Sequence, residues 1–144
     1  MSRPVVLDSD ILSELSRGKT WAVERAREYL REHGRFTVTA VSAFERLRGY
    51  REAIRHGKHF DSYLRVFETF LRSCNVLPFD ELAAARAAEM WARSTGRQRH
   101  RLGDLLIAAI AGARGLPLAT RNVKDFRPFA EMESIGIELA DWTR

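Results

Sequence analysis

The sequence predicts an α/β fold in which a central parallel β-sheet of about five strands is flanked by helices. Short apolar segments typical of strands alternate with helical patterns along all 144 residues. The helical segments repeat apolar residues at i, i+3, i+4 and i+7, as amphipathic helices do. Alternation of this kind is characteristic of parallel sheets. Because the chain has no low-complexity tract, internal repeat or Pro/Gly-rich linker, we expect one continuous domain over residues 1–144.

Five segments are expected to form the strands. They are Val5–Leu7, Phe36–Thr39, Asn75–Leu77, Leu116–Ala119 and Ile135–Leu139. All are short, as strands buried between helices usually are.

Four well-marked helices are expected between these strands. Their apolar stripes run over Ala22–Leu30, Tyr63–Leu71, Ala84–Ala92 and Leu105–Ala113. Asp61 and Asp80 are expected to cap the second and third of them, and Gly34 to end the first. The first three stripes are expected to face the core, and the fourth segment is apolar on every side, as a fully buried helix is.

The composition limits the classes of function. Lys and Arg number 24 against 19 Asp and Glu, a net charge of +5, which favours an anionic partner such as nucleic acid or an acidic protein. The single cysteine, Cys74, excludes an internal disulfide and a cysteine-based zinc site. The longest apolar run, Leu105–Ala111, is far shorter than the ~18 residues of a membrane span, and the N-terminus lacks a secretory pattern. We therefore expect a cytoplasmic protein without membrane contact.

Acidic residues stand where the expected strands end. Asp8 directly follows the first strand, Glu45 comes shortly after the second, and Asp125 follows the fourth. Asp104 stands at the start of the wholly apolar helix. Because the carboxyl ends of parallel strands meet at one edge of a sheet, these four side chains are expected to share one cleft.

The first two acids also have a purely structural explanation. Asp8 could cap the short helix that follows it, although Asp10 could fill the same role. Ser42 and Glu45 have the spacing of a capping box, in which each side chain satisfies a backbone donor of the other. From the residues alone, the structural and functional explanations stay open.

The other two acids are similarly ambiguous, since Asp104 suits a helix N-terminus and Asn122 with Asp125 could form a turn. Taken together, however, acids crowded at one edge repel one another unless they are protonated or neutralised by a cation. Mg²⁺ and Mn²⁺ prefer oxygen ligands, and such an ion can activate water and stabilise the charge on an attacked phosphate. The pattern therefore indicates metal-assisted hydrolysis of a phosphodiester.

With these residues the sequence resembles the PIN-domain ribonucleases, above all the VapC-type toxins of bacterial and archaeal toxin–antitoxin pairs. The resemblance runs from Val5 to about Ile137. It depends on four motifs in the family's order, Val6–Leu15, Ser42–Gly49, Asp104–Ala111 and Ala119–Phe126. Each motif is weak alone, but their order and spacing are specific. The resemblance implies a single PIN-like domain.

The resemblance also implies an endoribonuclease that depends on Mg²⁺ or Mn²⁺, acts on an RNA substrate, forms a homodimer and is inhibited by a cognate antitoxin. It implies that four acids line the metal site, Asp8, Glu45, Asp104 and Asp125.

Three further positions are implicated beside these acids. Thr120 and Asn122 match polar positions that orient the fourth acid. Asp10 is a departure, because the family most often has Asn there, and it adds a negative charge near the site.

Basic residues crowd the loop before the third motif. Arg97, Arg99 and Arg101 are candidates for contacts with RNA phosphates, and a solvated loop is the alternative. For the antitoxin, a groove between the helices near Trp21 and Tyr63 is the expected docking place.

Two other functions compete with an RNA-cleaving toxin. A haloacid-dehalogenase-like phosphatase is suggested by Asp8 and Asp10 after an apolar strand, but that family has Thr or Val where Leu12 stands. The other alternative is a non-catalytic PIN domain that only binds RNA, which retention of all four acids does not favour.

Overall fold

The structure, a computed structural model, describes residues 3–132 and 136–143. Within these residues, five parallel strands form one sheet in the order β3-β2-β1-β4-β5. The strands are β1 (Val6–Leu7), β2 (Thr37–Thr39), β3 (Asn75–Leu77), β4 (Leu118–Thr120) and β5 (Leu139–Asp141). The predicted α/β fold is confirmed.

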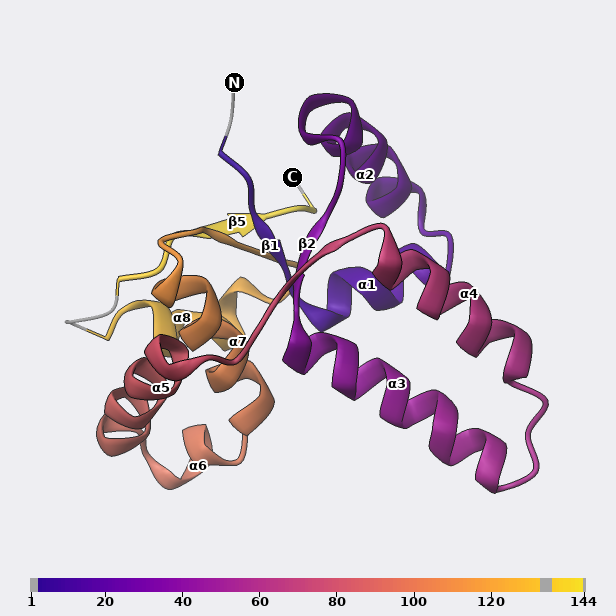
Figure 1. The fold of residues 1–144 in the computed structure, drawn as a ribbon. Helices are drawn as coiled ribbons and strands as arrows, with labels where there is room; N and C mark the ends of the chain where they lie inside the picture. Colours follow the sequence, from indigo (N-terminus) through magenta and orange to yellow (C-terminus); the bar gives the residue numbers. More distant parts are fainter. Residues whose placement is uncertain (1–2, 133–135, 144) are drawn as a thin grey trace.

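Helices cover both faces of this sheet. Along the described residues they are α1 (Ser9–Ser16), α2 (Thr20–His33), α3 (Ala40–Arg55), α4 (Asp61–Arg72), α5 (Glu81–Arg93), α6 (Gly96–Arg99), α7 (Leu102–Ala113) and α8 (Val123–Ala130). Figure 1 shows α1 to α4 on one side and α5 to α8 on the other, with α3 and α4 forming a long hairpin.

The strands supply side chains alternately to two apolar clusters. Val6 and Leu118 pack on the side of α5, α7 and α8, whereas the next residues, Leu7 and Ala119, pack on the side of α1, α2 and α4. This alternation follows from the two-residue period of a strand. Burial on both faces fixes the register of β1 against β4, and so fixes which residues emerge at the carboxyl edge.

Four of the five strands have bounds that differ from the prediction. The first two begin one residue later, at Val6 and Thr37, the fourth is Leu118–Thr120, and the fifth is Leu139–Asp141. The predicted fifth strand began at Ile135, which lies outside the described residues. Ile137 is buried in the core before β5 begins. Its apolar character therefore reports burial rather than strand pairing.

The apolar stripe of α4 only partly faces the core, contrary to the prediction. Leu64 and Phe67 are buried, but Tyr63 and Val66 are 57% and 69% exposed. The helix begins at Asp61, which lies in its first turn instead of capping it. The stripe predicted for α5 also faces the core only in part, since Ala87 is buried but Ala84 and Trp91 are exposed. Amphipathic spacing predicted both helices correctly but not which side chains are buried.

Other expectations from composition agree with the structure. Cys74 is a buried free thiol, and Asp80 caps α5 by accepting from the backbone N–H of Ala83 at 3.0 Å. None of the helices in the described ranges is both long and apolar enough to span a membrane.

Candidate active site

Asp8 is buried between β1, α1 and β4, and both of its oxygens are hydrogen-bonded. Oδ1 accepts from the backbone N–H groups of Asp10 at 3.0 Å and Ile11 at 3.1 Å. Oδ2 accepts from the hydroxyl of Thr120 at 2.5 Å. Asp8 is therefore the N-cap of α1, and the idea that Asp10 fills that role is wrong.

Asp10 faces the loop that follows β4. Its carboxylate accepts from the side-chain amide of Asn122 and from the backbone N–H of Arg121 at 3.4 Å. Thr120 and Asn122 thus contact the two aspartates of the first motif. The resemblance implied that these side chains orient Asp125. They hold Asp8 and Asp10 instead, because the loop after β4 turns back over the N-terminus of α1.

Glu45 is not part of a capping box. Strand β2 runs directly into α3, so Thr39 becomes the N-cap and its hydroxyl accepts from the backbone N–H of Ser42 at 3.0 Å. Ser42 therefore lies inside the helix. The carboxylate of Glu45 instead accepts from the hydroxyl of Ser9 at 2.8 Å, which joins the second motif to the first.

A glycine brings Glu45 close to the start of α7. A Cβ at Gly103 would lie 2.5 Å from Oε2 of Glu45, so a side chain here would displace this carboxylate. The absence of a side chain allows Glu45 to lie beside Asp104, in the first turn of α7. The sequence analysis missed Gly103 and Ser9, although each directly adjoins a motif acid.

Arg101 is the cation within this group of acids. Its guanidinium lies 3.2 Å from Oδ2 of Asp104 and 2.8 Å from Oδ2 of Asp125. The hydrogen bond from Arg101 is the main cause that holds the pKa of Asp125 below its usual value. The side chain of Asp125 is therefore engaged at the site and does not cap α8.

The other two candidate arginines lie outside this group. Arg99 donates to the backbone carbonyl of Trp91 at 3.1 and 3.3 Å and lies 4.7 Å from the centre of its ring. Arg99 thus closes the C-terminal end of α5. Arg97 is exposed to solvent.

Burial, together with neighbouring acids, favours the neutral forms of Asp8 and Asp104. Burial raises the pKa of Asp104 to about 6, and the charges of Glu45, Asp125 and Asp10 add to this rise while Arg101 opposes it. Burial, followed by contact with Asp10, raises the pKa of Asp8 to about 9. A cation at these oxygens would reverse the preference.

The donor set fits Mg²⁺ or Mn²⁺. The candidate ligands are carboxylate and hydroxyl oxygens, which hard cations prefer. In the part of the chain that the structure describes, no three acidic, His or Cys side chains converge closely enough to enclose an ion. Mg²⁺ does not require such a cage, because it commonly binds through one or two carboxylates and retains several waters.

A buried glutamate, paired with two partly exposed arginines, helps to hold the elements that carry the site. Glu14 on α1 is only 2% exposed, and its carboxylate lies 3.0 Å from the guanidinium of Arg121 and 3.2 Å from that of Arg17. The contact with Arg121 ties α1 to the loop after β4, where Asn122 holds Asp10. The sequence analysis assigned no role to Glu14; a glutamate inside a short apolar helix was the available signal.

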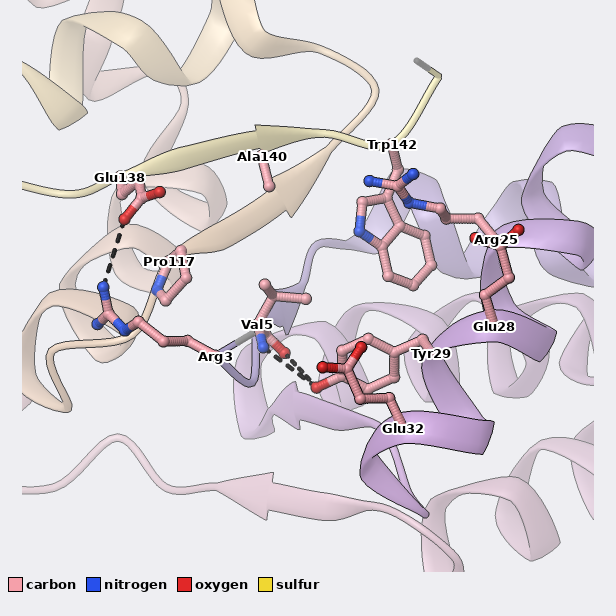
Figure 2. Close-up of a pocket in the computed structure, with 10 residues that line it drawn as sticks. All are labelled: Arg3, Val5, Arg25, Glu28, Tyr29, Glu32, Pro117, Glu138, Ala140 and Trp142. Carbon is pink, nitrogen blue, oxygen red and sulfur yellow. Dashed lines mark hydrogen bonds and ion pairs between the residues drawn. The ribbon is translucent and has the colours of Figure 1, made fainter. Parts of the chain in front are cut away.

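A cavity of about 420 Å³ lies at the opposite, amino-terminal edge of the sheet (Figure 2). Val5, Pro117 and Glu138 line it, and they precede β1, β4 and β5. Arg3 pairs with Glu138 at 3.3 Å, and the backbone N–H of Val5 donates to the hydroxyl of Tyr29 at 3.1 Å. The charged groups that line this cavity are of both signs, whereas the opposite edge of the sheet is rich in carboxylates.

A second cavity of about 420 Å³ is an apolar groove along α1, α3 and α4, hereafter the α3–α4 groove. It is lined mainly by apolar and aromatic side chains, including Leu15, Tyr63, Val66 and Phe67. Tyr63 thus lies where the docking groove was expected, whereas Trp21 packs against the core.

Comparisons with known proteins agree with this architecture. The PIN domain family model matches residues 5–132, which contain all four candidate acids. Ribonuclease VapC10 of Mycobacterium tuberculosis is 35% identical over 133 residues, 90% of each chain. The tRNA(fMet)-specific endonuclease VapC of Salmonella typhimurium is 26% identical over 129 residues, which cover 85% of this chain and 90% of that one.

A solved structure shows the same fold at lower identity. DNA-bound VapBC from Salmonella typhimurium matches with a TM-score of 0.71 and 23% identity, over 98% of this chain and 99% of the matched chain. The resemblance inferred from the four motifs is thereby confirmed. The chain belongs to the PIN domain family, as a VapC-type member of it.

Proposed function

We propose that this chain is a metal-dependent endoribonuclease and the toxin of a toxin–antitoxin pair. The observation that carries the proposal is the gathering of acids from four motifs at the carboxyl edge of the sheet, linked by Ser9, Arg101 and Gly103. The names of two VapC relatives, a ribonuclease and a tRNA endonuclease, support RNA as the substrate. Membership of the PIN family argues against the phosphatase alternative.

Asp8 and Asp104 are the proposed direct ligands of Mg²⁺ or Mn²⁺, with Glu45 and Asp125 acting partly through water. When bound, the ion supplies an activated water and stabilises the charge that develops on the attacked phosphate. The chain's own residues hold the acids in place: Thr120 fixes the carboxylate of Asp8, as outer partners of metal ligands do.

Arg101 has two successive roles in this proposal. In the ion pairs it neutralises Asp104 and Asp125. A divalent cation held by the same oxygens would compete with Arg101 for these carboxylates. A guanidinium freed from them would be available to meet an RNA phosphate beside the acids.

The α3–α4 groove is the proposed docking site for the antitoxin. Tyr63 and Val66 expose apolar surface along it, and an amphipathic helix is a common occupant of such grooves. Solved relatives of this fold include VapBC complexes. Homodimerisation, implied by the resemblance, remains a prediction.

The first test replaces proposed ligands by their isosteric amides. We expect Asp104→Asn and Asp8→Asn to lower metal-dependent cleavage about a hundredfold or more while the protein stays folded. Asn suits position 8 because it also caps helices, whereas Asp8→Ala would cost about 1–2 kcal/mol. Cleavage of a defined RNA pool with Mg²⁺, Mn²⁺ or EDTA measures the effect.

Asp80→Asn is the matched control for these variants, since Asp80 also caps a helix but belongs to α5. It should cleave at the wild-type rate. Wild-type activity in Asp104→Asn would refute the site, and a wild-type protein that binds RNA but never cuts it would favour the non-catalytic alternative.

Metal binding should strengthen as the pH rises. The neutral acids favoured by the pKa values of about 6 for Asp104 and about 9 for Asp8 must lose protons to bind a cation. Affinity should rise about tenfold per pH unit for each proton released below its pKa. Calorimetric titration with Mn²⁺ between pH 5.5 and 7.5, in buffers of different ionisation enthalpy, measures both affinity and proton release.

Without metal, the contribution of these acids to stability changes with pH in the opposite direction, and falls as the pH rises. Both acids have raised pKa values in the folded state, so their contribution to the free energy of unfolding is present near pH 4 and is lost as the pH rises towards about 9. A Mn²⁺ affinity that does not change between pH 5.5 and 7.5 would contradict the assignment of Asp8 and Asp104 as metal ligands.

Removal of the Arg101 guanidinium should strengthen metal binding at the acids. We expect Arg101→Gln to tighten Mn²⁺ binding roughly three- to tenfold. This factor corresponds to the loss of exposed ion pairs that contribute up to about 1 kcal/mol each. RNA cleavage should not increase in parallel, because the phosphate contact is lost as well. Arg97→Gln on the neighbouring exposed loop is the control, and equal affinities in the two variants would exclude competition by Arg101.

A charge in the α3–α4 groove should prevent binding of the antitoxin without changing RNA cleavage. We expect Val66→Glu to abolish copurification and inhibition by the antitoxin while RNA cleavage stays at the wild-type rate, because a carboxylate cannot be buried there without a partner. Thr69→Glu places the same charge on α4 at an exposed position that does not line the groove. If both variants retain the inhibitor, the antitoxin docks elsewhere.

A further inference from the structure

A hollow of about 390 Å³ adjoins the acidic site along α1 and α3, hereafter the trough. Ser9 and Glu45, which hydrogen-bond each other within the site, form one end of it. Gly49 and Tyr50 of α3 form its side, and Phe60, just before α4, forms the other end. Its volume falls within the range of small-molecule sites in proteins.

Gly49 is present in α3 without a local structural reason. It lies in the interior of the helix, where glycine is among the least favourable residues. Its φ is not positive, so the backbone does not require glycine. No atom lies within 4 Å of a Cβ built at this position, so packing does not require it either. What the missing side chain provides is the open space of the trough.

The position of the trough points to its occupant. RNA is a polymer, so a phosphodiester at the acids carries a nucleoside on each side into the adjoining space. Glu45 belongs to both the acidic site and the trough. We propose that the trough binds the nucleoside that flanks the scissile phosphate, and that Gly49 keeps this subsite open; the inference depends on the proposed ribonuclease function.

The wall of the trough suits a nucleobase. Phe60 supplies an aromatic ring, the kind of group on which single-stranded bases stack. Tyr50 contributes to the wall, although its ring packs against Phe67 and the guanidinium of Arg46. The edge of Tyr63 supports the ring of Phe60, with centroids 5.1 Å apart and planes at 85°. Lys58 lies with its ammonium 5.7 Å from the same ring and is exposed, where it can meet a neighbouring phosphate.

The charge beside the trough favours a polyanion such as RNA over a basic or apolar peptide. Residues 48–59 contain four cationic side chains, Arg48, Arg51, Arg55 and Lys58, against the single carboxylate of Glu52. All five of these side chains are exposed. Four positive charges against one negative charge complement an RNA backbone that continues from the acids along α3.

Gly49→Leu tests the subsite, with Gly49→Ala as its matched control. Both substitutions improve helix propensity, so both proteins should unfold at or above the wild-type temperature, by roughly 2–6 °C for the alanine variant. Only leucine fills the trough. For Gly49→Leu we expect KM for RNA to rise about tenfold or more, and the base preference beside the cut to weaken, while Mn²⁺ affinity stays at the wild-type value.

The outcomes separate this inference from the proposed function. If wild-type protein cuts RNA and Gly49→Leu cuts it with the KM and base preference of Gly49→Ala, the trough is not a nucleoside subsite. If Gly49→Leu also loses Mn²⁺ affinity, the substitution acts on the acids and the inference fails. If its cleavage is normal but it escapes inhibition by the copurifying antitoxin, the trough belongs to that protein partner instead. Absence of cleavage by the wild type would count against the ribonuclease function itself.

Discussion

The buried carboxylate of Asp8 is the constraint on which the site depends. A buried carboxyl group is costly unless its oxygens are hydrogen-bonded, and here three donors from two regions of the chain meet it. Two are backbone N–H groups at the start of α1, and the third is the hydroxyl of Thr120 at the end of β4. These bonds join β1, α1 and β4 at one point. Asp10 lies beside this junction, where Asn122, two residues after Thr120, holds its carboxylate.

Around this junction every acid has a partner, which offsets part of the repulsion within the group. Asp10 is held by Asn122 and Glu45 by Ser9, whereas Asp104 and Asp125 share Arg101. Asp104 is incompletely compensated, because burial and neighbouring charges raise its pKa to about 6 despite the ion pair with Arg101. The pKa of Asp8 is raised further, to about 9, so a bound cation would stabilise the charged forms of both acids.

The sequence predicted the parallel fold and the edge where acids gather, because apolar strands followed by acids leave few alternatives. It did not settle which residues cap α1 and α3, although it correctly predicted Asp80 as the cap of α5. Asp8 rather than Asp10 caps α1, and Thr39 rather than Ser42 caps α3, since capping depends on where a strand gives way to a helix. The contact between Gly103 and Glu45 joins residues far apart in sequence, so no local pattern reveals it.

The geometry of α3 places the proposed substrate site beside the proposed antitoxin groove. Glu45 and Gly49 are four residues apart and share one face of the helix. Arg46, one residue further round, lines both the trough and the α3–α4 groove, where it donates to Ser13 and Tyr50. A partner in the proposed docking groove would therefore contact Arg46, the residue next to Glu45. The proposed docking groove and the proposed nucleoside subsite thus share one helix.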